Sequence, residues 1–291
     1  MPSHAEMSCA VHLDVGLSLS CSLQQLFLSL SRTATAKGAK MRVEAVLFDL
    51  FNTLVLLEND DAFYMPSLKR LHNFLVQNEI DIPFDDFVRF YFEVRDRLYE
   101  ETSESLEDPH FNIRVSRTLE KFGYKLGASH PTVVGATGAF CEEFMKYARP
   151  DDDALYVLER LHKKYKLGIV SNLSIPECAS KLLEKFGMNG FFDAVVISGA
   201  INKRKPSPEI YEKALEVLGI MADKAVFVGD TPRIDIKGAK TVGLKTVLIE
   251  RQQPSEGSLS LTYELPGANE KVLPDGVIKS LRELLDLLED C

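Results

Sequence analysis

Short apolar runs alternate with longer amphipathic segments along much of the chain. The apolar runs predict strands, and apolar residues at three- and four-residue spacing predict the helices between them. The predicted strands are Val43–Phe48, Leu167–Ser171, Ala194–Ser198, Ala225–Gly229 and Lys245–Ile249. The predicted helices are Asp152–Tyr165, Pro176–Phe186, Pro208–Leu218 and Ile234–Val242. Such alternation is typical of a parallel sheet that is covered by helices on both faces.

The interval between the first two predicted strands has a different character. Apolar residues recur at helical spacing through residues 58–148, as at Leu68, Leu71 and Leu75. Turn signals divide this interval into about four helices; they lie at Ile82-Pro83, Asp108-Pro109, Gly123–Gly127 and His130-Pro131. We therefore expect an α/β fold, with a Rossmann-like parallel-sheet core from 41–57 and 149–291. Residues 58–148 are expected to form an inserted helical-bundle cap domain.

The two ends of the chain are harder to interpret. Residues 1–40 are rich in Ser, Leu and Ala, but they lack an early basic residue and make a poor secretory signal. We expect them to be a dispensable extension. Residues 251–274 are expected to form a loop. The segment Gly276–Leu288 predicts an amphipathic helix, with a short strand at Val277–Ile278 as an option.

Composition and charge narrow the possible functions. Hydrophobic residues make up 45% of the 291 residues and charged residues 26%, as in an ordinary globular protein. The net charge of −9 argues against a nucleic-acid partner, and no apolar run is long enough to cross a membrane. The five cysteines are scattered without a CxxC pair, which favours free thiols in the cytoplasm. The oligomeric state cannot be predicted from the sequence.

Polar residues with catalytic potential stand where predicted strands end. Asp49 follows the first strand, Ser171 and Asn172 end the second, and Gly229-Asp230 end the fourth. In parallel α/β sheets, ligands bind beyond the carboxyl ends of the strands. These residues are therefore expected to meet in one crevice. Each of them alone has an ordinary explanation, such as a helix cap or a turn.

Together with Lys205-Pro206 and Asp235, these residues resemble the four motifs of the haloacid dehalogenase superfamily. The resemblance runs from about residue 43 to the C-terminus, and its strongest part is AVFVGDTPRIDIKGAKTVGLKTVLI at 225–249. The position of the insert matches the helical C1-type cap of that superfamily. The resemblance implies an Mg²⁺-dependent phosphatase that acts on a small phosphorylated molecule through an aspartyl-phosphate.

The resemblance also assigns roles to individual residues. Asp49 is the implied nucleophile, and Ser171, Asn172 and Lys205 would hold the phosphoryl group. Thr53 would hold the loop after Asp49 by hydrogen bonds. The implied Mg²⁺ ligands are Asp49, the main-chain carbonyl of Phe51, Asp230 and Asp235, since Mg²⁺ prefers oxygen ligands. An acid at position 235 could instead complement a helix dipole, although the GDTPRID spacing favours the metal.

Phe51 departs from the phosphatase pattern, which has an aspartate there as general acid and base. True dehalogenases of the superfamily have an aromatic residue there, but they lack the metal-binding pair. Two alternatives therefore stay open: a metal-independent 2-haloacid dehalogenase-like hydrolase, and a non-catalytic binder of phosphorylated ligands. A substitute base could come from Glu58, Asp60 or Asp61, although a solvated linker is the simpler interpretation.

The substrate itself is not encoded in a readable motif. It would be selected by cap residues and by the side chain of Phe51. Five basic cap residues could meet an anion, although most such residues on amphipathic helices are simply solvated: His72, Arg89, Arg95, Arg97 and Arg114.

Overall fold

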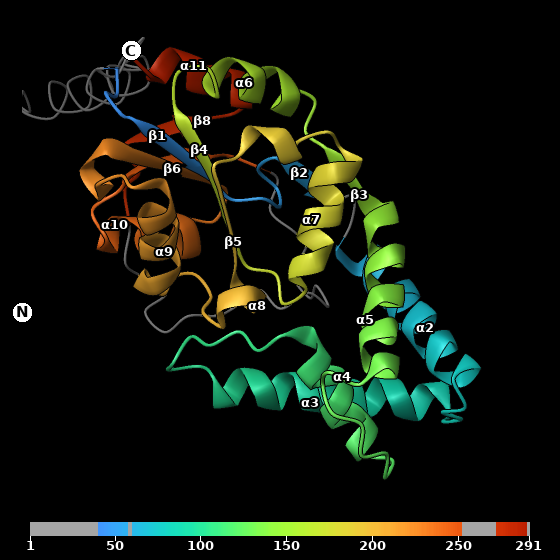
Figure 1. Cartoon of the computed structure of the whole chain (residues 1–291). Helices are drawn as coiled ribbons and strands as arrows, with labels where there is room; N and C mark the ends of the chain where they lie inside the picture. Colours follow the sequence, from blue (N-terminus) through green and yellow to red (C-terminus); the bar gives the residue numbers. More distant parts are fainter. Residues whose placement is uncertain (1–39, 58–59, 252–271, 290–291) are drawn as a thin grey trace, which may run out of the picture. The chain divides into compact units, whose positions relative to one another are not determined.

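A six-stranded parallel sheet forms the centre of the fold (Figure 1). The computed structural model describes residues 40–57, 60–251 and 272–289. The strands lie in the order β5 (Ala194–Ile197), β4 (Lys166–Ser171), β1 (Ala45–Phe48), β6 (Ala225–Gly229), β7 (Lys245–Ile249) and β8 (Gly276–Ile278). The predicted parallel α/β sheet is therefore confirmed, and β1 lies between β4 and β6.

Side chains of the sheet enter two separate cores because successive residues of a strand point to opposite faces. Val46 and Phe48 are buried in one core, and Ala45 and Leu47 in the other. The first core includes residues of α6 (Ala154–Leu161), α7 (Pro176–Lys185) and α11 (Leu284–Leu287). The second includes residues of α9 (Pro208–Leu218) and α10 (Lys237–Thr241). Both faces are covered, which explains why the strands are apolar throughout.

Four α-helices of the described residues make up most of the insert between β1 and β4, and Figure 1 draws them in cyan to green. They are α2 (Asp60–Gln77), α3 (Phe84–Glu101), α4 (Phe111–Glu120) and α5 (Pro131–Phe144). Helix α2 packs against α5, and α3 against α4. The ring nitrogens of His110 and His130 cap α4 and α5 by accepting from Asn112 N and Thr132 N. The predicted breaks fall at the observed helix boundaries.

A short antiparallel ladder, absent from the sequence prediction, joins the insert to the sheet. Strand β2 (Val55–Leu57) pairs with β3 (Ala148–Pro150), so the chain runs into the insert and returns from it side by side. Strands of three residues are too short to show a period of two, and tertiary pairing decides them. The division into a core domain and a cap domain at 58–148 stays a prediction.

The prediction of a helix over Gly276–Leu288 was wrong in its first half. Residues Gly276–Ile278 form β8, and a short 3-10 turn (η5, Leu281–Glu283) leads into the brief α11. The carboxylate of Asp275 accepts hydrogen bonds from Thr246 N and Thr246 Oγ1, which fixes β8 beside β7. The optional strand at Val277–Ile278 was therefore the better interpretation.

The remaining short elements connect the longer ones. They are α8 (Ser198–Ile201), the 3-10 turns η1 (Met145–Tyr147), η2 (Asn189–Phe191) and η3 (Ala222–Lys224), and the π-helical turn η4 (Pro232–Ile236). The proposed extension 1–40 and the loop 251–274 lie almost wholly outside the described residues. Of the helices that are described, none has the length and apolar character to cross a membrane.

Candidate active site

The carboxyl ends of three neighbouring strands bring the predicted residues together. Asp49 directly follows β1, Ser171 is the last residue of β4, and Asp230 directly follows β6. Because β4, β1 and β6 are adjacent and parallel, their ends open on the same edge of the sheet. The crevice that the sequence predicted is present there.

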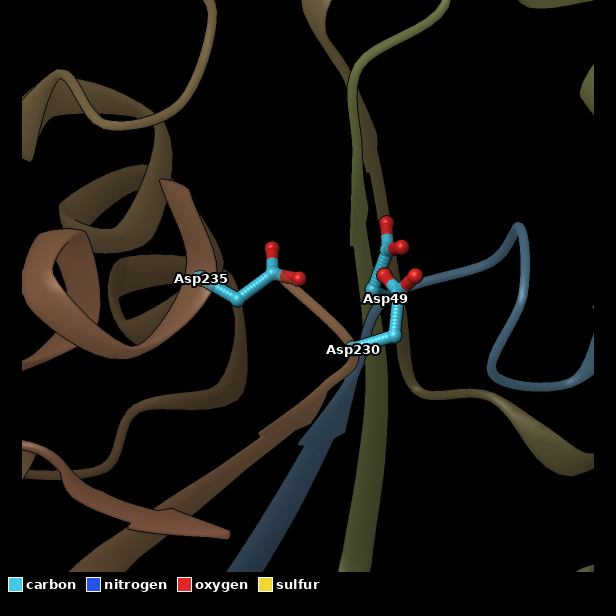
Figure 2. Close-up of side chains that lie close together, drawn as sticks. All are labelled: Asp49, Asp230 and Asp235. Atoms are coloured by element: carbon cyan, nitrogen blue, oxygen red, sulfur yellow. The ribbon is translucent and has the colours of Figure 1, made fainter. Parts of the chain in front are cut away.

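Three carboxyl groups converge at this edge (Figure 2). Asp49, Asp230 and Asp235 each offer an oxygen, and these oxygens all lie within 4.8 Å of one another. Asp235 comes from η4, where its Oδ2 accepts from Thr231 N at 2.9 Å. Figure 2 shows its carboxyl group reaching towards the ends of β1 and β6. This close approach requires Gly229, since a Cβ there would lie 2.5 Å from Asp235 Cγ.

One buried ammonium group links two of the carboxylates. Lys205 Nζ donates to Asp49 Oδ1 at 2.6 Å and to Asp235 Oδ1 at 2.7 Å, and the lysine is only 3% exposed. The three carboxylates and this ammonium group carry a formal charge of −2. A divalent cation would neutralise that charge, and an all-oxygen donor set suits Mg²⁺. The residues present therefore fit the metal that the sequence predicts.

Burial and mutual repulsion shift the pKa values of this cluster. Burial raises the pKa of Asp49 to about 6; Lys205 opposes the shift and Asp235 adds to it. Burial and the charges of Asp235 and Asp49 raise the pKa of Asp230 to about 7. Burial alone would lower the pKa of Lys205, but Asp235 and Asp49 outweigh burial and raise it. The lysine is thus held charged, while two of the carboxyl groups lack full compensation.

The side chains of Asn172 and Ser171 differ in their hydrogen bonding. Both polar atoms of the Asn172 side chain bind the main chain of Lys205: Nδ2 donates to its carbonyl at 3.1 Å, and Oδ1 accepts from its N–H at 2.7 Å. Asn172 therefore positions Lys205, and it also lines the cavity; its contact with a phosphoryl group stays a prediction. Ser171 Oγ is buried without a hydrogen-bond partner among the described residues. Such an orphaned hydroxyl is the type of group that a phosphoryl oxygen satisfies.

Phe51 and Thr53 lie on the loop after Asp49. Phe51 lines the cavity beside Asp49, and its ring centroid is 5.7 Å from that of Phe144 in α5. The hydroxyl of Thr53 has no hydrogen-bond partner in the described structure, contrary to the expected role. Arg251 holds this loop instead, by donating to the carbonyls of Asn52 and Thr53 at 3.0 and 3.3 Å. Sequence analysis missed Arg251 because it belongs to a segment without helical or strand pattern.

The insert closes one side of a cavity of about 340 Å³ that contains Asp49 and Lys205. Of the five basic insert residues considered above, Arg95 and Arg114 line this cavity. His72 is buried against the carbonyl of Ile82, at 2.8 Å. Arg89 and Arg97 form exposed pairs with acidic residues of their own helix. The acid candidate Glu58 lies outside the described residues, as do the side chains of Asp60 and Asp61.

Arg204 makes more contacts than expected for a residue in a basic run. It stands in the run Lys203-Arg204-Lys205, where the sequence predicts solvated side chains for Lys203 and Arg204, but Arg204 is only 4% exposed. It donates to Thr102 Oγ1 and to the carbonyl of Thr102, both at 2.9 Å, and to the carbonyl of Glu107. These partners belong to the insert, and Arg204 is covalently next to Lys205. The basic run therefore couples the insert to the charged cluster.

Comparison with known proteins gives consistent matches. A family model described as haloacid dehalogenase-like hydrolase matches residues 43–243. A glyceraldehyde 3-phosphate phosphatase of Methanopyrus kandleri is 30% identical over 198 residues, which cover 67% of this chain and 80% of that protein. A phosphoglycolate phosphatase of Aquifex aeolicus is 38% identical over 110 residues, or 38% of this chain; the match spans about half of that protein, 51%.

A solved structure with a similar fold is a HAD phosphatase from Thermococcus onnurineus. It is 26% identical in sequence and has a TM-score of 0.56. The superposition covers 85% of this chain and 98% of the other. The likeness therefore includes the helical insert as well as the sheet.

Proposed function

The chain belongs to the haloacid dehalogenase-like hydrolase family, and from this premise we propose that it is an Mg²⁺-dependent phosphatase. The substrate would be a small phosphate ester, hydrolysed through an aspartyl-phosphate on Asp49. A cytoplasmic location stays a prediction from the scattered cysteines.

The observation that carries this proposal is the cluster of Asp49, Asp230 and Asp235 around Lys205 Nζ. Three buried or half-buried carboxyl groups this close together repel one another, and a cation relieves that repulsion. The relatives support the same class of reaction, since both relatives described above are named phosphatases. Their names give different substrates, so the substrate of this chain does not follow from them.

The residues suggest how the reaction would proceed. An oxygen of Asp49 forms a bond to phosphorus while the bond from phosphorus to the ester oxygen breaks, and the ester oxygen takes up a proton from water as the alcohol leaves. Lys205 and the hydroxyl of Ser171 stabilise the phosphoryl oxygens. Water then attacks phosphorus, which releases phosphate and regenerates Asp49. Mg²⁺, held by Asp49, Asp230, Asp235 and the carbonyl of Phe51, would supply positive charge to the phosphoryl group.

A second candidate rests on Phe51, whose aromatic side chain lines the cavity beside the nucleophile. A 2-haloacid dehalogenase-like hydrolase would use Asp49 to displace halide from carbon, without a metal. The third option is a non-catalytic binder, in which the absent acid leaves the site inert. The three differ in metal dependence and in turnover.

The test measures phosphate release from p-nitrophenyl phosphate and halide release from 2-chloropropionate, each with Mg²⁺ and with a chelator. We expect phosphate release that the chelator abolishes and Mg²⁺ restores. Asp230→Asn should reduce it similarly, while the matched change Asp152→Asn, at an exposed position, should not. Halide release that persists in chelator would favour the dehalogenase-like hydrolase. Absence of turnover of either compound would favour the non-catalytic binder.

A further inference from the structure

Arg114 is a buried guanidinium group among uncharged neighbours. It lies on α4 and is 7% exposed. Its Nη1 donates to Tyr91 Oη at 3.1 Å and to Tyr64 Oη at 3.4 Å, and its Nε has no hydrogen-bond partner in the described structure. The ring centroids of Phe111, Tyr99 and Tyr91 lie 5.2, 5.5 and 5.7 Å from its Cζ.

These neighbours do not neutralise the positive charge. Burial raises the pKa of Tyr91 and of Tyr99, so both hydroxyl groups stay protonated. None of the carboxylates in the described residues lies within ion-pairing distance of Arg114. Arg114 does interact electrostatically with Asp108, but Asp108 Oδ2 accepts a hydrogen bond from Ser198 Oγ at 2.5 Å and burial raises the pKa of Asp108.

A buried arginine without a paired carboxylate is costly unless a ligand supplies the counter-charge. Arg114 lines the same cavity as Asp49 and Lys205. The two other arginines of this cavity are engaged: Arg95 pairs with Asp96 at 2.7 Å, and Arg204 binds carbonyls of the insert. The cavity thus has a phosphoryl-binding end at the sheet and an uncompensated cation at the insert.

We infer that the substrate carries a second anionic oxygen group, a carboxylate or a second phosphate, which binds Arg114 while its phosphate ester meets Asp49. This assignment rests on the proposed phosphatase function and makes Arg114 a determinant of specificity. The planar guanidinium suits such a group because it can donate two parallel hydrogen bonds to two oxygens. A cavity of about 340 Å³ restricts the substrate to a small molecule.

The experiment compares matched substrates that differ in one charged group. The carboxylate pairs are phosphoglycolate with phosphoglycolamide, and 4-carboxyphenyl phosphate with 4-carbamoylphenyl phosphate. The phosphate pair is propane-1,3-diol bisphosphate with its monophosphate. For each pair, kcat/KM with Mg²⁺ is measured for the wild type, Arg114→Gln, Arg114→Lys and the control Arg117→Gln. Arg117 is on the same helix but forms an exposed pair with Glu101.

We expect the wild type to favour the charged member of at least one pair by roughly 10- to 100-fold, the worth of a charge-assisted hydrogen bond. The ratio of kcat/KM for the charged member to kcat/KM for its uncharged partner should approach 1 in Arg114→Gln. It should be intermediate in Arg114→Lys and unchanged in Arg117→Gln. Whether the carboxylate pairs or the phosphate pair shows this preference identifies the second anionic group of the substrate. Equal rates within every pair in the wild type would overturn the inference, and this comparison needs no variant to fold.

The proposed function and the inference fail in different ways. Absence of phosphate release from every ester contradicts the phosphatase. In that case, calorimetry measures the dissociation constants of the same pairs. Tighter binding of the charged member that is lost in Arg114→Gln would support the anion site at Arg114. Equal or undetectable binding of both members would refute it. Circular dichroism verifies that each variant is folded.

Discussion

At the scale of single residues, the chemistry depends on what surrounds Asp49. Lys205 binds it on one side, and Asp230 and Asp235 stand close by. Two residues further along the chain, where the phosphatase pattern has a second aspartate, Phe51 packs edge-on against Phe144. In the proposed function, Asp49 is the nucleophile, Lys205 the electrostatic clamp and the three carboxyl groups the metal ligands, while an aromatic ring takes the place of the proton donor.

Substitutions at Asp49 and Phe51 should have opposite effects. Asp49→Asn should abolish turnover because no covalent intermediate can form. Phe51→Asp should raise phosphatase activity, up to about 10²-fold, because it supplies a general acid. The gain should be larger for an alkyl phosphate than for a phenyl phosphate, since an alkoxide leaves poorly without a proton. Steady-state rates on both esters measure this.

Phe51→Leu is the control for Phe51→Asp, since it removes the ring without adding a carboxyl group. If Phe51→Asp lowers the rate on both esters while the fold stays intact, the ring is a required wall of the cavity. The dehalogenase-like alternative would then gain support.

The raised pKa values of Asp49 and Asp230 predict a pH-dependent stability. Between the unfolded pKa of 3.8 and folded values of about 6 and 7, the metal-free folded state binds more protons than the unfolded chain. Its free energy of unfolding should therefore fall as pH rises from about 4 to 7. Mg²⁺ requires the deprotonated carboxylates, so its stabilising effect should grow over the same range. Melting temperatures against pH, in chelator and in excess Mg²⁺, measure both slopes.

Asp230→Asn separates the contributions to that pH dependence. It removes a titrating group, so the decline in chelator should flatten, most of all near pH 7. It also removes a ligand, so Mg²⁺ should stabilise the variant less than the wild type. Parallel curves for the two proteins in chelator would contradict the assignment.

At the scale of elements, the junction of β6 with η4 sets the geometry of the proposed metal site. Gly229 ends β6, and the π-helical turn of η4 returns Asp235 so close that a Cβ on residue 229 would meet its carboxyl group at 2.5 Å. A glycine here reflects a close approach of a side chain to the strand rather than a turn with positive φ.

Gly229→Ala should displace Asp235 by a fraction of an ångström or more. We expect Mg²⁺ affinity and kcat to fall by at least 10-fold, since catalytic groups tolerate little displacement. The control is Gly190→Ala, because nothing lies within 4 Å of a Cβ at position 190. Calorimetric titration of Mg²⁺ gives the affinity directly. Wild-type affinity in Gly229→Ala would show that the site adapts.

At the scale of the whole molecule, the insert and the sheet share one cavity, and Arg204 ties them together next to Lys205. The amide of Arg204 also donates to the carbonyl of Leu106 at 2.9 Å. We propose that residues 58–148 act as a lid whose position adjusts the lysine. The ladder of β2 and β3 marks the two crossings of the chain between lid and core.

Arg204→Ala should loosen the segment 102–108 of the insert, because it removes the side-chain bonds to Thr102 and Glu107 and keeps the main-chain bond to Leu106. We expect faster hydrogen exchange of backbone amides in that segment, and a fall in kcat/KM of about 10-fold, because closure and lysine placement are lost together. If hydrogen exchange in the variant is as slow as in the wild type while turnover is reduced, the substitution acts locally on Lys205. Mass-spectrometric exchange of both proteins under native conditions distinguishes these outcomes.

Local patterns in the sequence were sufficient to predict the class of fold and to group several polar residues of the candidate site. Apolar runs fully buried on both faces are readable as parallel strands, and residues at their carboxyl ends must face one edge, so Asp49, Ser171 and Asp230 could be grouped in advance. Helix breaks at proline and glycine are equally local, and they located the four insert helices.

The tertiary structure decided what depends on contacts between distant residues. The ladder of β2 and β3, the strand at Gly276–Ile278 and the clamp from Arg251 arise from long-range pairing that no local period encodes. Burial likewise separated Arg114 and Arg204 from the solvated arginines that they resemble in sequence. The role of a charged side chain depends on whether it is buried and on which groups it contacts. Packing sets both conditions.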